Sequence, residues 1–170
     1  MNLRVVSAGL VSLLTRRYAG PFWVRRRQLQ RSQWFDEEML RHLQLRLLRR
    51  LLKHCYAAVP FYRRLMDERG ITVGDIQDLE DTRAFPILTK QDVLAAQSNL
   101  LSARYPRWLR RTAFTGGTTG TPMALQRDLF AIGTEQAFLR RQYDWAGLGL
   151  RDPCAFLTGR TVARPGQTRR

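Results

Sequence analysis

A loop rich in glycine and threonine, Thr115–Pro122, restricts the fold of this chain more than any other segment. It separates two stretches, Trp108–Phe114 and Met123–Gln126, that are predicted to be the strands of a hairpin. An ordinary hairpin turn has about two to five residues and rarely has this composition. Glycines let the backbone approach a bulky anion, and successive N–H groups and threonine hydroxyls can donate hydrogen bonds to phosphate oxygens. The loop is therefore predicted to bind a polyphosphate.

The loop is not a Walker A motif, which ends in Gly-Lys-Ser/Thr, because Gly120 is followed by Thr121-Pro122 without a lysine. The candidate phosphate-binding residues are Thr115, Gly116, Gly117, Thr118, Thr119, Gly120, Thr121 and Pro122.

A long amphipathic helix is predicted to start at Asp36, ahead of the carboxylates Glu37 and Glu38 at the positive end of the helix dipole. Apolar residues recur at helical spacing at Leu40, Leu43, Leu47, Leu48, Leu51 and Cys55. The helix is expected to end at Val59, because a residue before proline is pushed out of the helical region.

Shorter elements are predicted between this helix and the hairpin. They are, in chain order, a helix Phe61–Arg69 that stops at Gly70, a polar turn or brief helix Asp75–Asp81, and a buried extended link Phe85–Leu88. Thr89 is expected to cap a further helix from Lys90, with Asp92 completing a short capping box.

After the hairpin, Asp128 is expected to cap a helix that runs to about Trp145 and ends at Gly147 and Gly149, and Cys154–Leu157 is a predicted buried strand. The predicted fold class is α/β: a helical N-terminal region followed by the first part of an α/β domain whose sheet is incomplete. The expected segments are 1–35 (a helix and a basic aromatic segment), 36–105 (helical), 106–159 (the start of a nucleotide-binding α/β domain with the loop 115–122) and 160–170 (a tail).

The formal net charge is +15, from 29 Lys and Arg against 14 Asp and Glu, and all but two of these cations are arginine. A genome with GC-rich codons gives this bias without selection, and no nucleic-acid-binding motif accompanies it. The predicted long helix carries a basic stripe of Arg46, Arg49, Arg50 and Lys53. We interpret the stripe as a solvated face, with a phosphate-binding surface as the alternative, and expect no nucleic-acid partner.

The N-terminal segment combines an apolar run, Val5–Leu14, with a cluster of cations and aromatic rings. No secretory signal is predicted, because Thr15-Arg16-Arg17 follows the run in place of a small-residue cleavage site. The cluster comprises Arg16, Arg17, Tyr18, Phe22, Trp23, Arg25, Arg26 and Arg27. We interpret the segment as a helix packed on the rest of the domain, with peripheral membrane contact as the alternative.

Two cysteines, Cys55 and Cys154, lie far apart and have no metal-type partner spacing, which favours a reducing compartment and predicts no metal site. We expect a cytoplasmic location, with membrane association as the alternative. His42 and His54 both fall on the predicted long helix, where a structural or solvated role is expected rather than catalysis.

The loop resembles the phosphate-binding signature of the adenylate-forming superfamily of acyl-CoA synthetases, Thr-Ser-Gly-Thr-Thr-Gly-x-Pro. The matching residues are Thr115, Gly117, Thr118, Thr119, Gly120 and Pro122. Three upstream blocks, His54–Arg63, Asp78–Asp81 and Phe85–Asp92, narrow the resemblance. Together they resemble the phenylacetate-CoA ligase branch, including the CapK-type proteins linked to capsular polysaccharide biosynthesis. The resemblance runs from about Trp34 to Gly159.

The chain departs from the family pattern at two positions in this region. Gly116 replaces the usual serine, and Met123 stands where many members have lysine. ATP binding is still expected, because the backbone donors and the matching threonine hydroxyls remain. Thr134-Glu135 is not equated with the family's later Thr-Glu motif, because it follows the loop closely within a predicted helix.

The resemblance implies an AMP-forming acid–thiol ligase that joins a small carboxylate to ATP with Mg²⁺, releases pyrophosphate and passes the acyl group to a thiol such as coenzyme A. It also implies that the Mg-binding glutamate, the ribose-binding aspartate and the lid lysine lie C-terminal to Arg170. We expect an N-terminal fragment that is inactive alone: a truncated or partial product, or half of a split enzyme completed by a second polypeptide. The alternative class is a non-enzymatic peripheral membrane or scaffold protein that uses the basic aromatic N-terminus.

Overall fold

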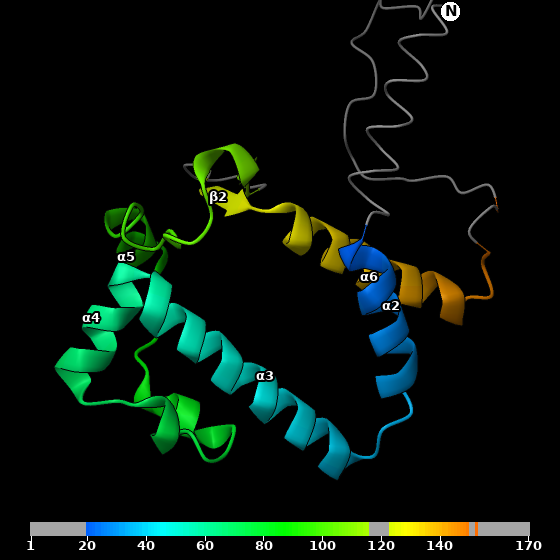
Figure 1. The fold of residues 1–170 in the computed structure, drawn as a ribbon, viewed down its shortest axis with the longest axis horizontal. Helices are drawn as coiled ribbons and strands as arrows, with labels where there is room; N and C mark the ends of the chain where they lie inside the picture. The colour runs from blue at the N-terminus through cyan, green and yellow to red at the C-terminus, as the bar shows by residue number, and fades with distance from the viewer. Residues whose placement is uncertain (1–19, 116–122, 150–151, 153–170) are drawn as a thin grey trace, which may run out of the picture. The chain divides into compact units, whose positions relative to one another are not determined.

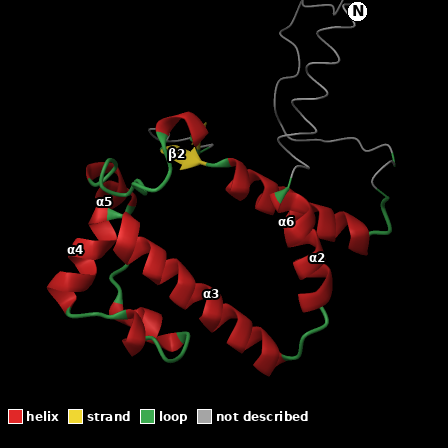
Figure 2. Ribbon diagram, viewed as in Figure 1, coloured by secondary structure: helices red, strands yellow, loops and turns green. Residues whose placement is uncertain are grey.

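The computed structural model describes residues 20–115, 123–149 and 152. They belong to two compact units, one over residues 30–132 and one from the described parts of 1–29 and 133–170. Helix predominates, and the described residues form one two-stranded sheet (Figure 2). This content is compatible with the predicted α/β class. The run predicted as the first helix, the strand predicted at Cys154–Leu157 and the tail lie outside the described residues.

The longest element of the larger unit is α3 (Glu37–Ala58), which starts where the sequence predicts. The carboxylate of Asp36 accepts a hydrogen bond of 2.8 Å from the N–H of Met39 and so satisfies one of the unpaired donors of the first turn. The helix ends at Val59, whose φ of −120° and ψ of 107° are extended, as expected before a proline.

Immediately after this break follows α4 (Pro60–Arg69), with proline in its first turn (Figure 1). Gly70 ends the helix with a φ of +63°, which confirms the predicted left-handed cap. The small core of the larger unit lies around the α3–α4 junction and comprises Leu52, Ala58, Val59, Met66 and Ile76. Ile76 comes from the segment after α4.

That segment contains two short 3-10 helices, η1 (Val73–Asp75) and η2 (Glu80–Ala84), in agreement with a polar turn or brief helix. An extended link then leads to α5 (Lys90–Ala95). The predicted burial of the link Phe85–Leu88 is wrong, because Ile87 is 95% exposed. Its apolar composition was the only sign of burial, and no described segment packs over this side chain.

The capping box before α5 is confirmed. The backbone N–H of Thr89 donates to Asp92 Oδ2 over 2.8 Å, its hydroxyl donates to the same oxygen over 2.6 Å, and the N–H of Asp92 donates back to Thr89 Oγ1 over 3.2 Å. The side-chain and backbone hydrogen bonds from Thr89 hold the pKa of Asp92 below its usual range.

Beyond α5 the chain forms η3 (Arg107–Leu109) and then the hairpin of β1 (Arg111–Phe114) and β2 (Ala124–Arg127). The predicted strand over Trp108–Phe114 is therefore wrong in its first part. Pro106 fixes φ at −63°, and its carbonyl accepts a hydrogen bond of 3.0 Å from the N–H of Leu109, so the backbone makes a turn before it becomes extended. The second strand lies one residue later than predicted.

The smaller unit contains most of α2 (Pro21–Ser32) and of α6 (Leu129–Trp145). The two helices approach closely, because a Cβ placed on Gly133 would lie 3.3 Å from the backbone nitrogen of Phe22. Phe22 is fully buried here. The basic aromatic stretch is thus helical with a buried ring, in line with its interpretation as a packed helix, and Pro21 at the first helical position is the local signal for the helix start.

An arginine cluster also ties this unit together. Arg140 is buried and donates to Asp144 over 2.8 Å and to the carbonyls of Leu148 and Gly149, while Arg26 reaches the other carboxylate oxygen of Asp144 over 3.2 Å. Burial alone would raise the pKa of Asp144, but the hydrogen bonds and charges of both guanidinium groups outweigh it and lower that pKa. The cluster thus stabilises the end of α6.

Candidate functional site

The base of the glycine- and threonine-rich loop is a regular antiparallel hairpin. The register pairs Arg111 with Arg127 at the far end and Phe114 with Ala124 next to the loop. One residue further, the N–H of Thr115 donates to the carbonyl of Met123 over 3.0 Å. The two strands therefore stay paired up to the first residue of the loop.

The hydroxyl of Thr115 also takes part in this closure, because Thr115 Oγ1 accepts a hydrogen bond of 3.0 Å from the N–H of Met123. A hydroxyl has one donor and two acceptor positions, so the O–H of Thr115 remains able to donate to an anion. The other predicted phosphate-binding residues, Gly116 to Pro122, lie outside the described residues. Their role stays a prediction, and the structure describes the frame that holds them.

Both ends of this frame are fixed by side chains. Before β1, the Arg110 guanidinium donates to the carbonyl of Tyr105 over 2.7 Å and to that of Ser102 over 2.9 Å. After β2, Asp128 Oδ1 accepts from the N–H of Ala131 over 2.6 Å and caps α6, as predicted. The order is strand, loop, strand and capped helix (Figure 1).

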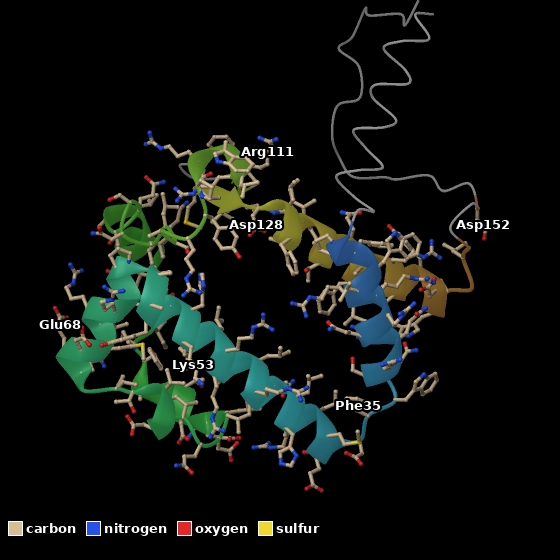
Figure 3. The ribbon with its side chains drawn as sticks, viewed as in Figure 1. Phe35, Lys53, Glu68, Arg111, Asp128 and Asp152 are labelled. Carbon is tan, nitrogen blue, oxygen red and sulfur yellow. The ribbon has the colours of Figure 1, made fainter. Side chains whose placement is uncertain are left out.

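Two hollows lie beside β2, and they differ in charge. The larger one, of about 520 Å³, lies between β2 and residues 93–101 and has no charged residue in its lining. The smaller one, of about 240 Å³, includes Arg110, Arg127 and Asp128. A carboxylate substrate needs a cation or several donors to replace its water shell. The larger hollow has no cation in its lining, and its side-chain donors are the neutral groups of Gln97, Ser98 and Gln126. Figure 3 labels Asp128 and Arg111 at this end of the larger unit.

The first upstream block of the family resemblance has a structural role. Arg63 donates to the carbonyls of Tyr56 and Ala57 over 2.9 and 2.7 Å, which satisfies acceptors left free at the end of α3. In the same block the N–H of Phe61 donates to the carbonyl of Asn99 over 3.0 Å. These contacts fasten the α3–α4 break to the segment that precedes the hairpin.

The acidic block is likewise structural. Asp81 Oδ2 accepts from the N–H groups of Gln77 and Asp78, each over 2.7 Å, while Arg41 on α3 reaches Asp78 and Glu80 over 3.0 Å. Hydrogen bonds from the N–H of Leu79 and from neighbouring side chains hold the pKa of Asp78 below its usual range. The carboxylates of this block are thus engaged in turns and ion pairs.

The histidines and the described cysteine show no catalytic arrangement. His42 is exposed on α3, and His54 lies with its ring centroid 6.1 Å from that of Tyr105. Burial raises the pKa of the Cys55 thiol, so the thiol loses its proton less readily and forms less of the reactive thiolate. Within the described ranges no group of three or more His, Cys, Asp or Glu side chains could hold a metal ion.

The basic stripe of α3 divides into two kinds of residue. Arg46, Arg50 and Lys53 are exposed, in line with a solvated face. Arg49 differs, because its Nε donates to the carbonyl of the buried Ile76 over 2.7 Å and so holds η1 against the helix. In the part of the chain that the structure describes, no helix is both long and apolar enough to cross a membrane.

No protein-family model matches the chain. Curated proteins named phenylacetate-coenzyme A ligase do match it. The ligase of Thermus thermophilus is 39% identical over 85 residues, which is 50% of this chain and 19% of the relative. That of Escherichia coli is 39% identical over 83 residues (49% and 19%), and that of Aromatoleum evansii is 30% identical over 112 residues (66% and 26%). The chain is therefore similar to phenylacetate-CoA ligases over about half its length, and the match spans only about a fifth to a quarter of each relative.

Proposed function

We propose that this chain is the N-terminal part of an adenylate-forming ligase, which activates a carboxylic acid as an acyl adenylate at the expense of ATP and transfers the acyl group to coenzyme A. The support is the similarity to phenylacetate-CoA ligases together with the loop Thr115–Pro122. The observation that carries the proposal is the closure of that loop's base by the paired Thr115 and Met123.

Formation of the acyl adenylate depends on hydrogen-bond donors to the phosphates more than on a general base. A carboxylate is already a competent nucleophile at neutral pH, and negative charge builds up on the pyrophosphate leaving group as the adenylate forms. Backbone N–H groups of the loop and the hydroxyls of Thr115, Thr118 and Thr119 are suited to stabilise that charge. Mg²⁺, bound through phosphate oxygens, would neutralise part of the same charge.

The acid that we propose first as substrate is phenylacetate, because the matched relatives carry that name. The placement with the CapK-type proteins stays a prediction. The match covers so little of each relative that we assign the ribose, magnesium and lid functions to polypeptide not represented in this sequence. That polypeptide is either a continuation of the same chain or a separate partner, and we expect the 170 residues alone to be inactive.

A chimaera tests the proposal with the chain's own residues. The region of the Thermus thermophilus ligase that corresponds to Trp34–Gly159 is replaced by this segment of the chain, which includes the loop and the hairpin, and phenylacetate-dependent exchange of labelled pyrophosphate into ATP is measured. We expect exchange above the background without acid. In the chimaera, Thr118→Ala with Thr119→Ala should lower the exchange rate by at least about tenfold, the usual cost of losing donors to a transition-state oxyanion.

The matched control is Thr112→Ala in β1, which removes a threonine hydroxyl that hydrogen-bonds to Gln126 on β2, away from the loop. It should leave the exchange rate within about twofold, because a single exposed hydrogen bond contributes little. A folded chimaera that retains full exchange after both loop substitutions would refute the loop's assigned role.

A further inference from the structure

Positive charge is concentrated in acid-free stretches of the chain, and one of them lies among the described residues around the hairpin. Between Asp92 and Asp128 there is no aspartate or glutamate, and five arginines fall in this interval: Arg104, Arg107, Arg110, Arg111 and Arg127. Ten of the 14 acidic residues lie in the preceding stretch, residues 36–92. The interval contains η3 and the hairpin.

The turn around η3 is held in shape by its own hydrogen bonds. The two bonds of Arg110 to the carbonyls of Tyr105 and Ser102 close it from the inside. At its start, the N–H of Ala103 donates to the carbonyl of Ala58 over 2.8 Å, which fixes the turn to the buried end of α3. Arg110 is thus used for structure, and the backbone of the turn is preorganised.

The outward side chains of this turn are cations and aromatic rings. Trp108 is 74% exposed, and Arg104, Tyr105, Arg107 and Arg111 are also exposed. We call these five residues the arginine–tryptophan turn. Cross-strand register places Arg111 opposite Arg127 at the start of the hairpin. Figure 3 labels Arg111 at this turn.

We propose that the arginine–tryptophan turn binds the surface of an anionic lipid bilayer. Tryptophan and tyrosine prefer the headgroup region, where an amphipathic ring is half in contact with water, and arginines beside them pair with anionic headgroups. An aromatic ring beside several cations provides both burial of apolar surface and electrostatic attraction to anionic lipids, the two contributions that reversible membrane binding needs. The arginine–tryptophan turn includes no residue of the N-terminal apolar run Val5–Leu14, and the inference does not depend on the proposed ligase activity.

A nucleic acid is the competing polyanion, and the turn suits it less well. Proteins that bind single strands usually offer several stacking rings in succession along a basic groove. Within residues 102–111, all of them described, Trp108 is the one aromatic side chain exposed for more than half of its surface, and the next such ring, Phe114 at 69%, lies at the far end of β1 beside the loop. A single exposed ring flanked by arginines fits a plane of headgroups better than a row of bases.

Co-sedimentation of the whole chain with vesicles tests the proposal. The vesicles are pure phosphatidylcholine or phosphatidylcholine with a minority of phosphatidylserine, at low and at high salt. The test variant carries Arg104→Gln, Arg107→Gln and Arg111→Gln. The matched control carries Arg46→Gln, Arg50→Gln and Lys53→Gln, which removes the same formal charge from exposed positions on α3.

We expect binding to the phosphatidylserine vesicles only, weakened by high salt because exposed charges are screened. The turn variant should lose at least about tenfold in partition coefficient, while the α3 control changes by less than about threefold. Trp108→Ala should weaken binding at least about threefold, and Trp34→Ala, which removes an 83% exposed tryptophan elsewhere, should not.

Three results with the vesicles would each overturn the proposal. In the first, the turn variant and the α3 control lose the same factor in partition coefficient. In the second, the chain binds equally to vesicles with and without phosphatidylserine. In the third, it does not bind phosphatidylserine vesicles at low salt. Binding of a single-stranded oligonucleotide is measured in parallel to test the competing partner. The proposal is also contradicted if Trp108→Ala weakens binding to the oligonucleotide but does not weaken binding to the vesicles. Circular dichroism of every variant checks that it is folded, so that weaker binding is not caused by unfolding.

Discussion

At the scale of single residues, several arginines of the larger unit bind backbone carbonyls. Arg49, Arg63 and Arg110 each donate to main-chain oxygens at a helix end or in a turn. The guanidinium group suits this role because it presents several donors in a fixed plane and stays charged at all relevant pH values. The formal charge of +15 therefore overstates how many arginines are available to a ligand.

Arg49 provides the clearest test of this role. Arg49→Met keeps the aliphatic stem but leaves the carbonyl of Ile76 without its donor, so we expect the free energy of unfolding to fall by about 1–2 kcal/mol. Arg50→Met changes the neighbouring, exposed position and should alter it by less than about 0.5 kcal/mol. Urea unfolding of both variants measures the difference, and equal effects would show that Arg49 adds nothing beyond its charge.

At the scale of elements, the sequence predicts the ends of the helices better than it predicts the segments that connect them. Asp36, Thr89 and Asp128 cap the helices as expected, and Gly70 ends α4 as expected, because caps depend on hydrogen bonds and backbone angles within a few residues. The same local character explains the correct end of α3 at Val59.

A prediction for Gly70 belongs to this scale. Gly70→Ala should lower the free energy of unfolding by about 1–2 kcal/mol, because a side chain is strained at a φ of +63° even though its Cβ would meet no atom within 4 Å. Gly74→Ala is the control, since a Cβ there makes an ordinary contact of 3.5 Å with Thr72 and no positive φ is involved. Thermal unfolding that ranks the two variants equally would contradict the strain argument.

One error of sequence reasoning concerns longer-range packing. The exposure of Ile87 depends on which distant segments pack against it, which composition does not reveal. A second error is local: the sequence predicts a strand from Trp108, whereas Trp108 and Leu109 belong to the turn that starts at Pro106. For the candidate site, the paired strands and the capped helix were predictable, whereas the use of the Thr115 hydroxyl in closing the loop was not.

At the scale of the whole molecule, the residues of the family resemblance divide by role. The first upstream block joins the α3–α4 break to the segment before the hairpin, the acidic block joins η2 to α3 through Arg41, and the third block caps α5. The loop at the end of the hairpin is the part with donors suited to phosphate chemistry. In the proposed ligase, this chain would thus supply a scaffold and the phosphate loop, and the remaining polypeptide would supply the rest of the active site.

The most direct test of the central claim is an equilibrium titration of ATP into the 170-residue chain and into its Thr118→Ala, Thr119→Ala variant. These substitutions leave the net charge unchanged, so attraction between ATP and the basic chain as a whole is the same in both. If the loop holds the phosphates, the variant should bind ATP at least about tenfold more weakly, because hydrogen bonds to charged groups are lost, and tripolyphosphate should compete while adenosine should not. Equal affinities of the two proteins for ATP would contradict the assignment of the loop as a phosphate site.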